Sequence, residues 1–255
     1  MIRLDPPGTF CQNAAVWDIL DRDARNFIDV GCGTGSVSRE LCRRGLTGLG
    51  IDASLEAVEI AGATMAEHIA AGRYDVRVAD VHDLPSEERD VAISLMVAEH
   101  LHDDIGFVRI VSSHVKPGGQ VIIGVPGRRD HWGYEDEVAG HLRRYERADL
   151  ESVLRAAGLE AVIVWSVAVP VANVLFHAGN RLVRRDTSAE IAMQGQREQT
   201  DTSGIREVRW KTVFPAWCRI LLNRITLYPC FVLQRAFYGT SWGITLIGSG
   251  RRPRH

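Results

Sequence analysis

The chain has 255 residues, of which 45% are apolar and 24% charged, a balance that argues against disorder along its whole length. The formal net charge is −2, so no field of one sign is available to hold a polyanion, and we expect no nucleic acid partner. The length suits one large domain, or one domain that carries a sizeable insertion.

The cysteines bear on metal binding and on the redox state of the cellular compartment, and the apolar stretches bear on secretion and membrane insertion. Five cysteines occur without a C-x-x-C pair, and no Cys/His cluster has zinc spacing, so we expect no metal and a reducing compartment. The N-terminus lacks the apolar core of a signal peptide, and the most apolar stretch, 162–176, is short for a membrane span. We predict a cytoplasmic chain without stable membrane insertion, and a homodimer stays an open option.

Apolar runs and helical spacings alternate along the first two thirds of the chain. After a helix predicted near 11–23, strands are expected at 26–30, 49–51, 75–79, 91–95, 120–125 and 161–167. Helices are expected at 35–44, 54–71, 103–115 and 148–157, with Ser54 as an N-cap and with Gly72 and Gly158 as stops. Such alternation predicts parallel strands with crossover helices on both faces of a sheet.

The alternation stops after about residue 167. A helix is predicted over 171–183, a mobile polar loop over 186–204, two or three short helices over 206–237 and a last strand at 243–248. The predicted fold class is therefore α/β, a doubly wound, mostly parallel, Rossmann-like sheet of seven strands with a helical insertion before the last strand. We expect the core at 1–167, the insertion, a candidate lid over the substrate site, at 168–238, and the last strand with a basic tail at 239–255.

The strongest functional signal is a glycine-rich turn at 29–35 (DVGCGTG), where the first strand passes into a helix. Glycines there let the backbone approach a ligand closely. Asp52 follows the second strand, where a carboxylate can accept hydrogen bonds from both ribose hydroxyls of an adenosine. Dinucleotide-binding enzymes use G-x-G-x-x-G, but here Ser36 occupies the third glycine position. The pattern favours a nucleoside ligand without a pyrophosphate.

With these residues the chain resembles the class I S-adenosylmethionine (SAM)-dependent methyltransferases, over about 25–165 plus the last strand. Segments 80–81 (DV), 95–102 (LMVAEHLH) and 116–119 (KPGG) resemble further motifs of that family. The resemblance implies that SAM is the cofactor and S-adenosylhomocysteine (SAH) the product, with Asp29 near the amino acid moiety, Asp52 on the ribose and Asp80 near the adenine. The cofactor-binding residues that it implies are Asp29, Gly31, Cys32, Gly33, Gly35, Asp52, Ala53, Asp80, Val81 and Leu95.

Candidate catalytic residues come from two further segments. His100 is the first candidate general base, because the segment after the fourth strand faces the methyl donor in that family. Segment 140–145 (GHLRRY) resembles the substrate-side loop of one subgroup, which makes His141 the second candidate base and Arg143 and Tyr145 candidate substrate contacts. The alternatives are a packing role for either histidine and a solvated face for the paired arginines Arg143 and Arg144.

Several functions stay open. The first is SAM-dependent methylation of a hydroxyl or amine of a small-molecule acceptor, in secondary-metabolite or envelope biosynthesis. The alternatives are methylation of a lipid or lipid-linked, quinone-like substrate, an NAD(P)-dependent oxidoreductase, and a non-catalytic SAM-binding protein. The aromatic residues of the insertion either line an apolar pocket or form a core or dimer face; they are Trp210, Phe214, Trp217, Tyr228, Phe231 and Tyr238. A third interpretation places Arg209, Trp210, Lys211 and Trp217 at a membrane surface.

Overall fold

The computed structural model describes residues 1–84, 87–187 and 210–254. Seven strands form one sheet in the order β4-β3-β2-β5-β6-β9-β7. Their bounds are β2 Asn26–Val30, β3 Thr47–Asp52, β4 Tyr74–Val78, β5 Arg89–Leu95, β6 Val115–Pro126, β7 Glu160–Val167 and β9 Thr245–Arg251. The first five of these pair in parallel, and β9 runs antiparallel between β6 and β7. The predicted seven-stranded, mostly parallel α/β fold is confirmed.

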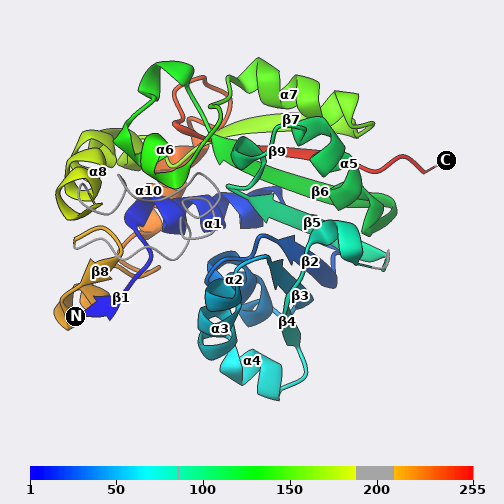
Figure 1. Cartoon of the computed structure of the whole chain (residues 1–255), viewed down its shortest axis with the longest axis horizontal. Helices are drawn as coiled ribbons and strands as arrows, with labels where there is room; N and C mark the ends of the chain where they lie inside the picture. The colour runs from blue at the N-terminus through cyan, green and yellow to red at the C-terminus, as the bar shows by residue number, and fades with distance from the viewer. Residues whose placement is uncertain (85–86, 188–209, 255) are drawn as a thin grey trace.

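Helices cover both faces of this sheet (Figure 1). Along β2, Ile28 packs in a core beneath α5 and α7, whereas its neighbour Phe27 packs in the opposite core beneath α1 and α2. This alternation is the period of two that a strand imposes, and it explains why strands buried on both faces have continuous apolar sequences. The helices of the core are α1 Pro7–Ile19, α2 Ser36–Arg43, α3 Leu55–Thr64, α4 Ala66–Ala70, α5 Asp104–Ser113, α6 Tyr134–Ala139 and α7 Arg147–Ala156.

Local signals explain most helix ends. The backbone N–H of Ala57 donates to Ser54 Oγ at 3.3 Å, so Ser54 caps α3 as predicted. Gly72 and Gly158 follow α4 and α7 with φ of +65° and +92°, a conformation that favours glycine. The single helix predicted over 54–71 is divided at Met65 into α3 and α4.

The segment between β7 and β9 contains α8 (Val171–Thr187), β8 (Val213–Phe214), a short 3-10 helix (Ala216–Ile220) and α10 (Tyr228–Arg235). Residues 186 and 187 belong to α8, and the remainder of the loop predicted over 186–204 lies outside the described residues. Strand β8 pairs antiparallel with β1 (Ile2–Arg3), a pairing that no sequence pattern predicted (Figure 1). The first residues of the chain therefore pack with this later segment.

The six aromatic residues considered above divide into a buried group and an exposed group. Phe214, Phe231 and Tyr238 are buried, and Phe231 packs with Cys11 of α1 and Ala168. Trp210, Trp217 and Tyr228 are exposed, and Arg209 lies outside the described residues. Within the described ranges, no helix has both the length and the apolar character needed to cross a membrane.

Candidate functional site

A cavity of about 1020 Å³ opens where the parallel strands β2, β3 and β5 end. Residues at these three strand ends line it, among them Gly31, Asp52 and Leu95. In open α/β sheets, the crevice at the carboxyl ends of the strands is the usual place for a ligand. The volume lies at the upper end of the range of roughly 300–1,000 Å³ for small-molecule sites, so it has room for a nucleoside and a second molecule.

The glycine-rich turn forms the floor of the cavity. Gly31, Gly33 and Gly35 have φ of +73°, +51° and +77°. The backbone N–H groups of Gly31 and Cys32 both donate to the carbonyl oxygen of Ile51, each at 2.9 Å. A side-chain carbon at Gly31 would collide with Val97. The turn therefore depends on glycine for its conformation and, at Gly31, for its close contact with the segment after β5.

Asp52 ties the turn to the end of β3. Its Oδ2 accepts a hydrogen bond from the N–H of Gly33, and its Oδ1 accepts one from the N–H of Ser54, both at 2.9 Å. An ionised carboxylate has about four acceptor positions, so both oxygens can accept a further donor. Asp52 and its neighbour Ala53 line the cavity, which leaves the carboxylate accessible to ligand hydroxyls.

Asp29, at the carboxyl end of β2, is a buried carboxyl group that lines the cavity. The hydroxyl of Ser38 donates to its Oδ2 at 2.6 Å. Burial raises the pKa of Asp29 to about 7, and the nearby charge of Asp52 adds to the effect. A cationic ligand group beside Asp29 would favour its ionised form, so this end of the cavity suits an ammonium group.

The start of α2 bears on the dinucleotide alternative. Ser36 Oγ donates to Asp5 Oδ2 at 2.7 Å and accepts from Asn13 Nδ2 at 2.8 Å. Dinucleotide-binding folds place a pyrophosphate at the N-terminus of this helix. Here the carboxylate of Asp5 accepts from the first residue of the helix and pairs with Arg39 at 3.1 Å, so it takes the place where a phosphate would bind.

The other cofactor candidates divide by position. Cys32, Asp80, Val81 and Leu95 line the cavity, whereas Gly35 caps α2 beside Met65 and is not among the lining residues. Burial raises the pKa of the Cys32 thiol far above its ordinary value, which leaves it protonated and a poor nucleophile. Asp80 is exposed at the rim, where its Oδ1 lies 2.9 Å from the N–H and 2.6 Å from Nδ1 of His82.

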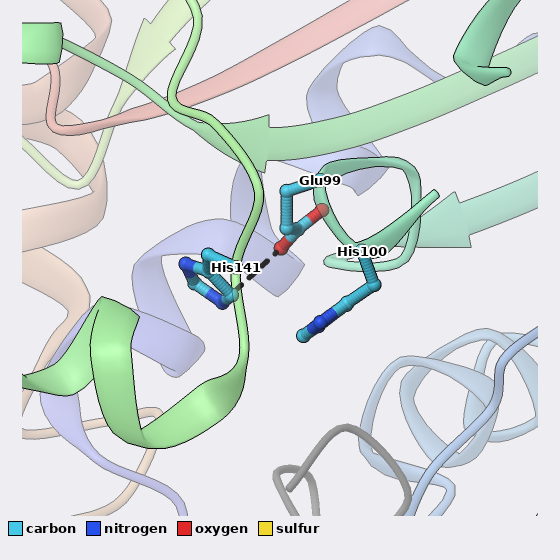
Figure 2. A group of neighbouring side chains, drawn as sticks. All are labelled: Glu99, His100 and His141. Atoms are coloured by element: carbon cyan, nitrogen blue, oxygen red, sulfur yellow. Dashed lines mark ion pairs between the residues drawn. The ribbon is translucent and has the colours of Figure 1, made fainter. Parts of the chain in front are cut away.

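The structure brings His100 and His141 together. His100 ends a 3-10 helix (Ala98–His100) after β5, and His141 lies in the loop after α6. Both side chains line the cavity, and their ring centroids are 4.8 Å apart in an edge-to-face arrangement (Figure 2). Burial lowers the pKa of His100 to about 4, and the neighbouring His141 contributes to the shift, so the His100 ring is neutral near pH 7.

His141 has a carboxylate partner on its far side. Its Nδ1 lies 2.7 Å from Oδ1 of the buried Asp136, which also accepts a hydrogen bond from Arg144 Nε at 2.8 Å. Burial alone would raise the pKa of Asp136, yet the hydrogen bonds from His141 and Arg144 hold it below its ordinary value. Because an ionised carboxylate only accepts, His141 Nδ1 donates, and its Nε2 carries the lone pair in the neutral ring.

Glu99 lies beside the two histidines and is fully buried. Among the residues that the structure describes, neither carboxylate oxygen of Glu99 accepts a hydrogen bond. Oε1 lies 3.8 Å from His141 Nε2 (Figure 2). Burial raises the pKa of Glu99 to about 7. A buried carboxyl without donors is costly in its charged form, which singles out this position as unusual.

The structure does not place Arg143 and Tyr145 at the cavity. Arg143 Nη1 donates to Asp104 Oδ2 at 3.1 Å, and the Tyr145 hydroxyl donates to the same oxygen at 2.8 Å. Arg143 Nη2 donates to the carbonyl oxygens of Leu101 and His102. Both side chains hold their loop against the start of α5, and their substrate role stays a prediction. Arg144 is buried as well and does not form a solvated face.

One further wall of the cavity was not predicted from the sequence. It includes residues of the N-terminal segment, α6, α8 and the segment before β8, namely Arg3, Asp5, Thr9, Gln12, Asn13, Glu135, Val138, Val183, Lys211 and Thr212. Lys211 Nζ lies 2.7 Å from Glu135 Oε2 across this wall. None of the six aromatic residues considered above is part of the lining.

One missed residue had a local signal. The backbone N–H of Gly133 donates to Asp136 Oδ2 at 2.8 Å, so a carboxylate three residues after a glycine marks the start of α6. That pattern could have located Asp136, although not its contact with His141. The residues of the cavity wall named above have no short-range pattern.

Comparison with known proteins gives the family. Residues 12–164 match a family model described as a methyltransferase domain. The ubiquinone biosynthesis O-methyltransferase of Brucella ovis is 32% identical over 102 residues, which are 40% of this chain and 41% of that protein. The protein of the same name in Methylobacterium nodulans is 35% identical over 100 residues, 39% of this chain and 40% of that protein. The chain thus spans about two fifths of the length of these curated relatives.

Solved structures share the fold. The [4+2]-cyclase SpnF has a TM-score of 0.62 at 20% identity, over 96% of this chain and 81% of that chain. Phosphoethanolamine N-methyltransferase 2 of Haemonchus contortus, in complex with SAM, has a TM-score of 0.60 at 17% identity, over 98% of this chain and 54% of that chain. These likenesses concern the fold alone. The family match covers more than half of the chain, and the chain therefore belongs to the class I SAM-dependent methyltransferase family.

Proposed function

We propose that the chain binds SAM in the cavity and transfers its methyl group to a hydroxyl group of a small molecule. The observation that carries the proposal is that one cavity joins the glycine turn and Asp52 to the His100–His141 pair. A donor and an acceptor held together in one enclosed space gain the alignment that a displacement reaction needs, which can supply roughly 7–11 kcal/mol in favourable cases.

The donor end is proposed from the residues at the strand ends. The ammonium group of the methionine moiety lies beside the buried carboxyl of Asp29, and the backbone of the glycine turn lies beneath it. Asp52 accepts hydrogen bonds from the ribose hydroxyls with the acceptor positions that Gly33 and Ser54 leave free. Asp80 and Val81 flank the adenine at the rim. The carboxylate of Asp5 at the start of α2 disfavours the NAD(P) alternative.

The acceptor end is proposed from the cluster Glu99–His100–His141. The hydroxyl oxygen attacks the sulfonium methyl, the oxygen–methyl bond forms as the sulfur–methyl bond breaks, and SAH leaves as the neutral thioether. The hydroxyl proton must be lost, and a site with two imidazoles and a carboxylate supports its removal. The names of the relatives, which are O-methyltransferases, favour oxygen over nitrogen as the acceptor atom.

The described parts of the insertion, 168–187 and 210–238, are proposed to cover the acceptor end. Val183, Lys211 and Thr212 of these parts line the cavity, and Lys211 pairs with Glu135 of α6. A covered acceptor end keeps water from the sulfonium group and so favours transfer to the bound hydroxyl.

Calorimetric titration tests the proposal. We expect SAM and SAH to bind, and NAD and NADP not to bind. Asp52→Asn removes one anionic acceptor and should weaken SAM binding by about tenfold or more, equivalent to roughly 1.4 kcal/mol. The matched control is Asp75→Asn on the neighbouring strand β4, whose exposed side chain pairs with Arg77, and it should leave the affinity unchanged. Binding of a nicotinamide dinucleotide, or equal SAM affinity in both variants, would refute the proposed cofactor site.

A quinone-like lipid acceptor is the second candidate. The relatives act in ubiquinone biosynthesis by name, and large apolar side chains are exposed along the short 3-10 helix and the turn after it, namely Trp217, Ile220, Leu221 and Ile225. We predict that the protein sediments with anionic phospholipid vesicles. The double variant Trp217→Ser and Ile225→Ser should reduce the fraction of protein that is bound to the vesicles. Val174→Ser, at an exposed residue of α8, is the control. No sedimentation of the unaltered chain would favour a water-soluble acceptor.

A further inference from the structure

We propose that Glu99, His100 and His141 bind a divalent metal ion of the zinc type at the acceptor end of the cavity. One ligand atom from each residue lies within 4.8 Å of the other two. Figure 2 shows Glu99 and His100 on one short turn and His141 on the loop that faces it. Zinc holds nitrogen and oxygen ligands at about 2.0–2.2 Å, so three ligands of one ion lie closer together than 4.8 Å, and binding requires Glu99 and His100 to rotate toward His141.

The first argument is the surroundings of the Glu99 carboxylate. The side chain is fully buried, and among the described residues no donor reaches either oxygen. Charged groups in protein interiors are paired or coordinate metals, because an unpaired buried charge is strongly destabilising. Nε2 of His141 lies 3.8 Å from Oε1, beyond hydrogen-bonding distance. A cation between these two residues would satisfy the carboxylate.

The second argument is the orientation of His141. Asp136 accepts a hydrogen bond from Nδ1 and is itself held by Arg144, so the ring cannot turn without breaking its bond to Asp136. Nε2 of the ring then faces Oε1 of Glu99, 3.8 Å away. This is the carboxylate–histidine arrangement that orients metal-binding imidazoles, in which the second nitrogen donates to a carboxylate.

The donor set selects the kind of metal. Two imidazoles and one carboxylate suit zinc, iron and nickel, whereas magnesium and calcium prefer oxygen ligands alone. Three protein ligands leave at least one coordination position open. His100 and His141 line the cavity, so that position faces the space proposed for the acceptor. An acceptor hydroxyl bound there would lose its proton to solvent more readily, and the imidazoles would serve as ligands and not as bases.

This proposal revises the expectation of no metal. That expectation rested on cysteine and histidine spacing, and this cluster contains no cysteine and joins residues 41 positions apart in the chain, as 141 − 100 shows. Metal binding is measured without SAM or acceptor, so its failure would leave the proposed function intact.

The experiment is a titration of chelator-treated protein with Zn²⁺ by calorimetry, and with Co²⁺ by visible absorption. We expect one tight site per chain, with the absorption bands of cobalt bound to nitrogen ligands. Glu99→Gln and His141→Ala should each weaken binding by about tenfold or more, and Asp136→Asn by about 10–100-fold, because Asp136 orients the His141 ring. His102→Ala, at an exposed histidine two positions from the cluster, is the matched control and should bind as the unaltered chain does.

A measurement on the unaltered chain guards against variants that fail to fold. In the NMR spectrum of the imidazole protons, Zn²⁺ should shift the signals of His100 and His141 and leave that of His102 in place. Absence of a tight site in a protein that still binds SAM would overturn the metal proposal. So would shifts confined to histidines outside the cluster. If the unaltered chain binds the metal ion tightly but does not bind SAM, that result would instead overturn the proposed function.

Discussion

At Gly31 two constraints act on one residue. Its φ of +73° disfavours any side chain, and an added carbon would also collide with Val97. Gly45 has a φ of +96° but open space around it. Comparing substitutions at Gly31 and Gly45 therefore separates the effect of backbone strain from the effect of a steric collision.

We predict that Gly31→Ala weakens SAM binding by about tenfold or more, because the turn must shift away from the segment after β5. Gly45→Ala should lower the free energy of unfolding by roughly 1–2 kcal/mol while leaving the SAM affinity unchanged. Calorimetric titration and urea unfolding of both variants check the two effects. Equal loss of affinity in the two variants would show that the collision at Gly31 is irrelevant.

The residue scale also shows how far sequence reasoning reaches. The positions of Gly31 and Asp52 could be predicted, because each follows a short apolar run and the ends of parallel strands meet at one edge. The position of Arg143 could not, because its partner Asp104 is 39 residues away and no local pattern links them. The same holds for His141 and Glu99, whose proximity depends on how the loop after α6 returns to the sheet.

At the scale of elements, strands buried on both faces were the easiest to predict, since their apolar runs are continuous. The two-residue strands β1 and β8 were missed, because each is too short to show a period and they lie at distant points of the chain. Contacts between the ends of elements were also missed, because the residues that form them lie at distant points of the chain. Arg251 Nη1 donates to Asp21 Oδ2 at 2.6 Å, which joins the end of β9 to the residues after α1.

This contact predicts a pH dependence of stability. The N–H of Asp23 and the guanidinium of Arg251 lower the pKa of Asp21 in the folded chain. A depressed folded pKa stabilises the fold above the unfolded pKa of about 3.9, and this contribution is lost as the pH falls through the folded value. Asp21→Asn should therefore lower the free energy of unfolding at pH 7 and make no difference in strong acid. Asp23→Asn, at an exposed neighbour, is the control, and urea unfolding across the acid range is the measurement.

At the scale of the whole molecule, the segment between β7 and β9 shares a core with the α/β sheet. Gln234 of α10 is fully buried, donates from Nε2 to the carbonyl oxygen of Cys11 and accepts at Oε1 from the N–H of Ala168, both at 2.9 Å. One side chain thus links α10, α1 and the residues that precede α8. The shared contacts favour unfolding of the two parts together.

We predict that Gln234→Met leaves the buried N–H of Ala168 unpaired, because the Cys11 carbonyl oxygen keeps its helical partner in α1, and lowers the free energy of unfolding by roughly 1–3 kcal/mol. Leu233→Met, at an exposed neighbour on the same helix, should stay within about 0.5 kcal/mol. Guanidinium unfolding followed by tryptophan fluorescence and by circular dichroism is the measurement. Two separate transitions in the unaltered chain would contradict a shared core.

The cavity walls come from stretches that leave the ribosome at different times. The residues around the proposed donor, from Asp29 to Val81 together with Leu95, emerge within the first hundred positions. Another wall combines Asp5 and Gln12 with Lys211 and Thr212, so it is completed only after the chain has been synthesised past β8. Because β9, which lies inside the sheet between β6 and β7, is synthesised later still, the complete cavity forms only when the chain up to about residue 251 is available.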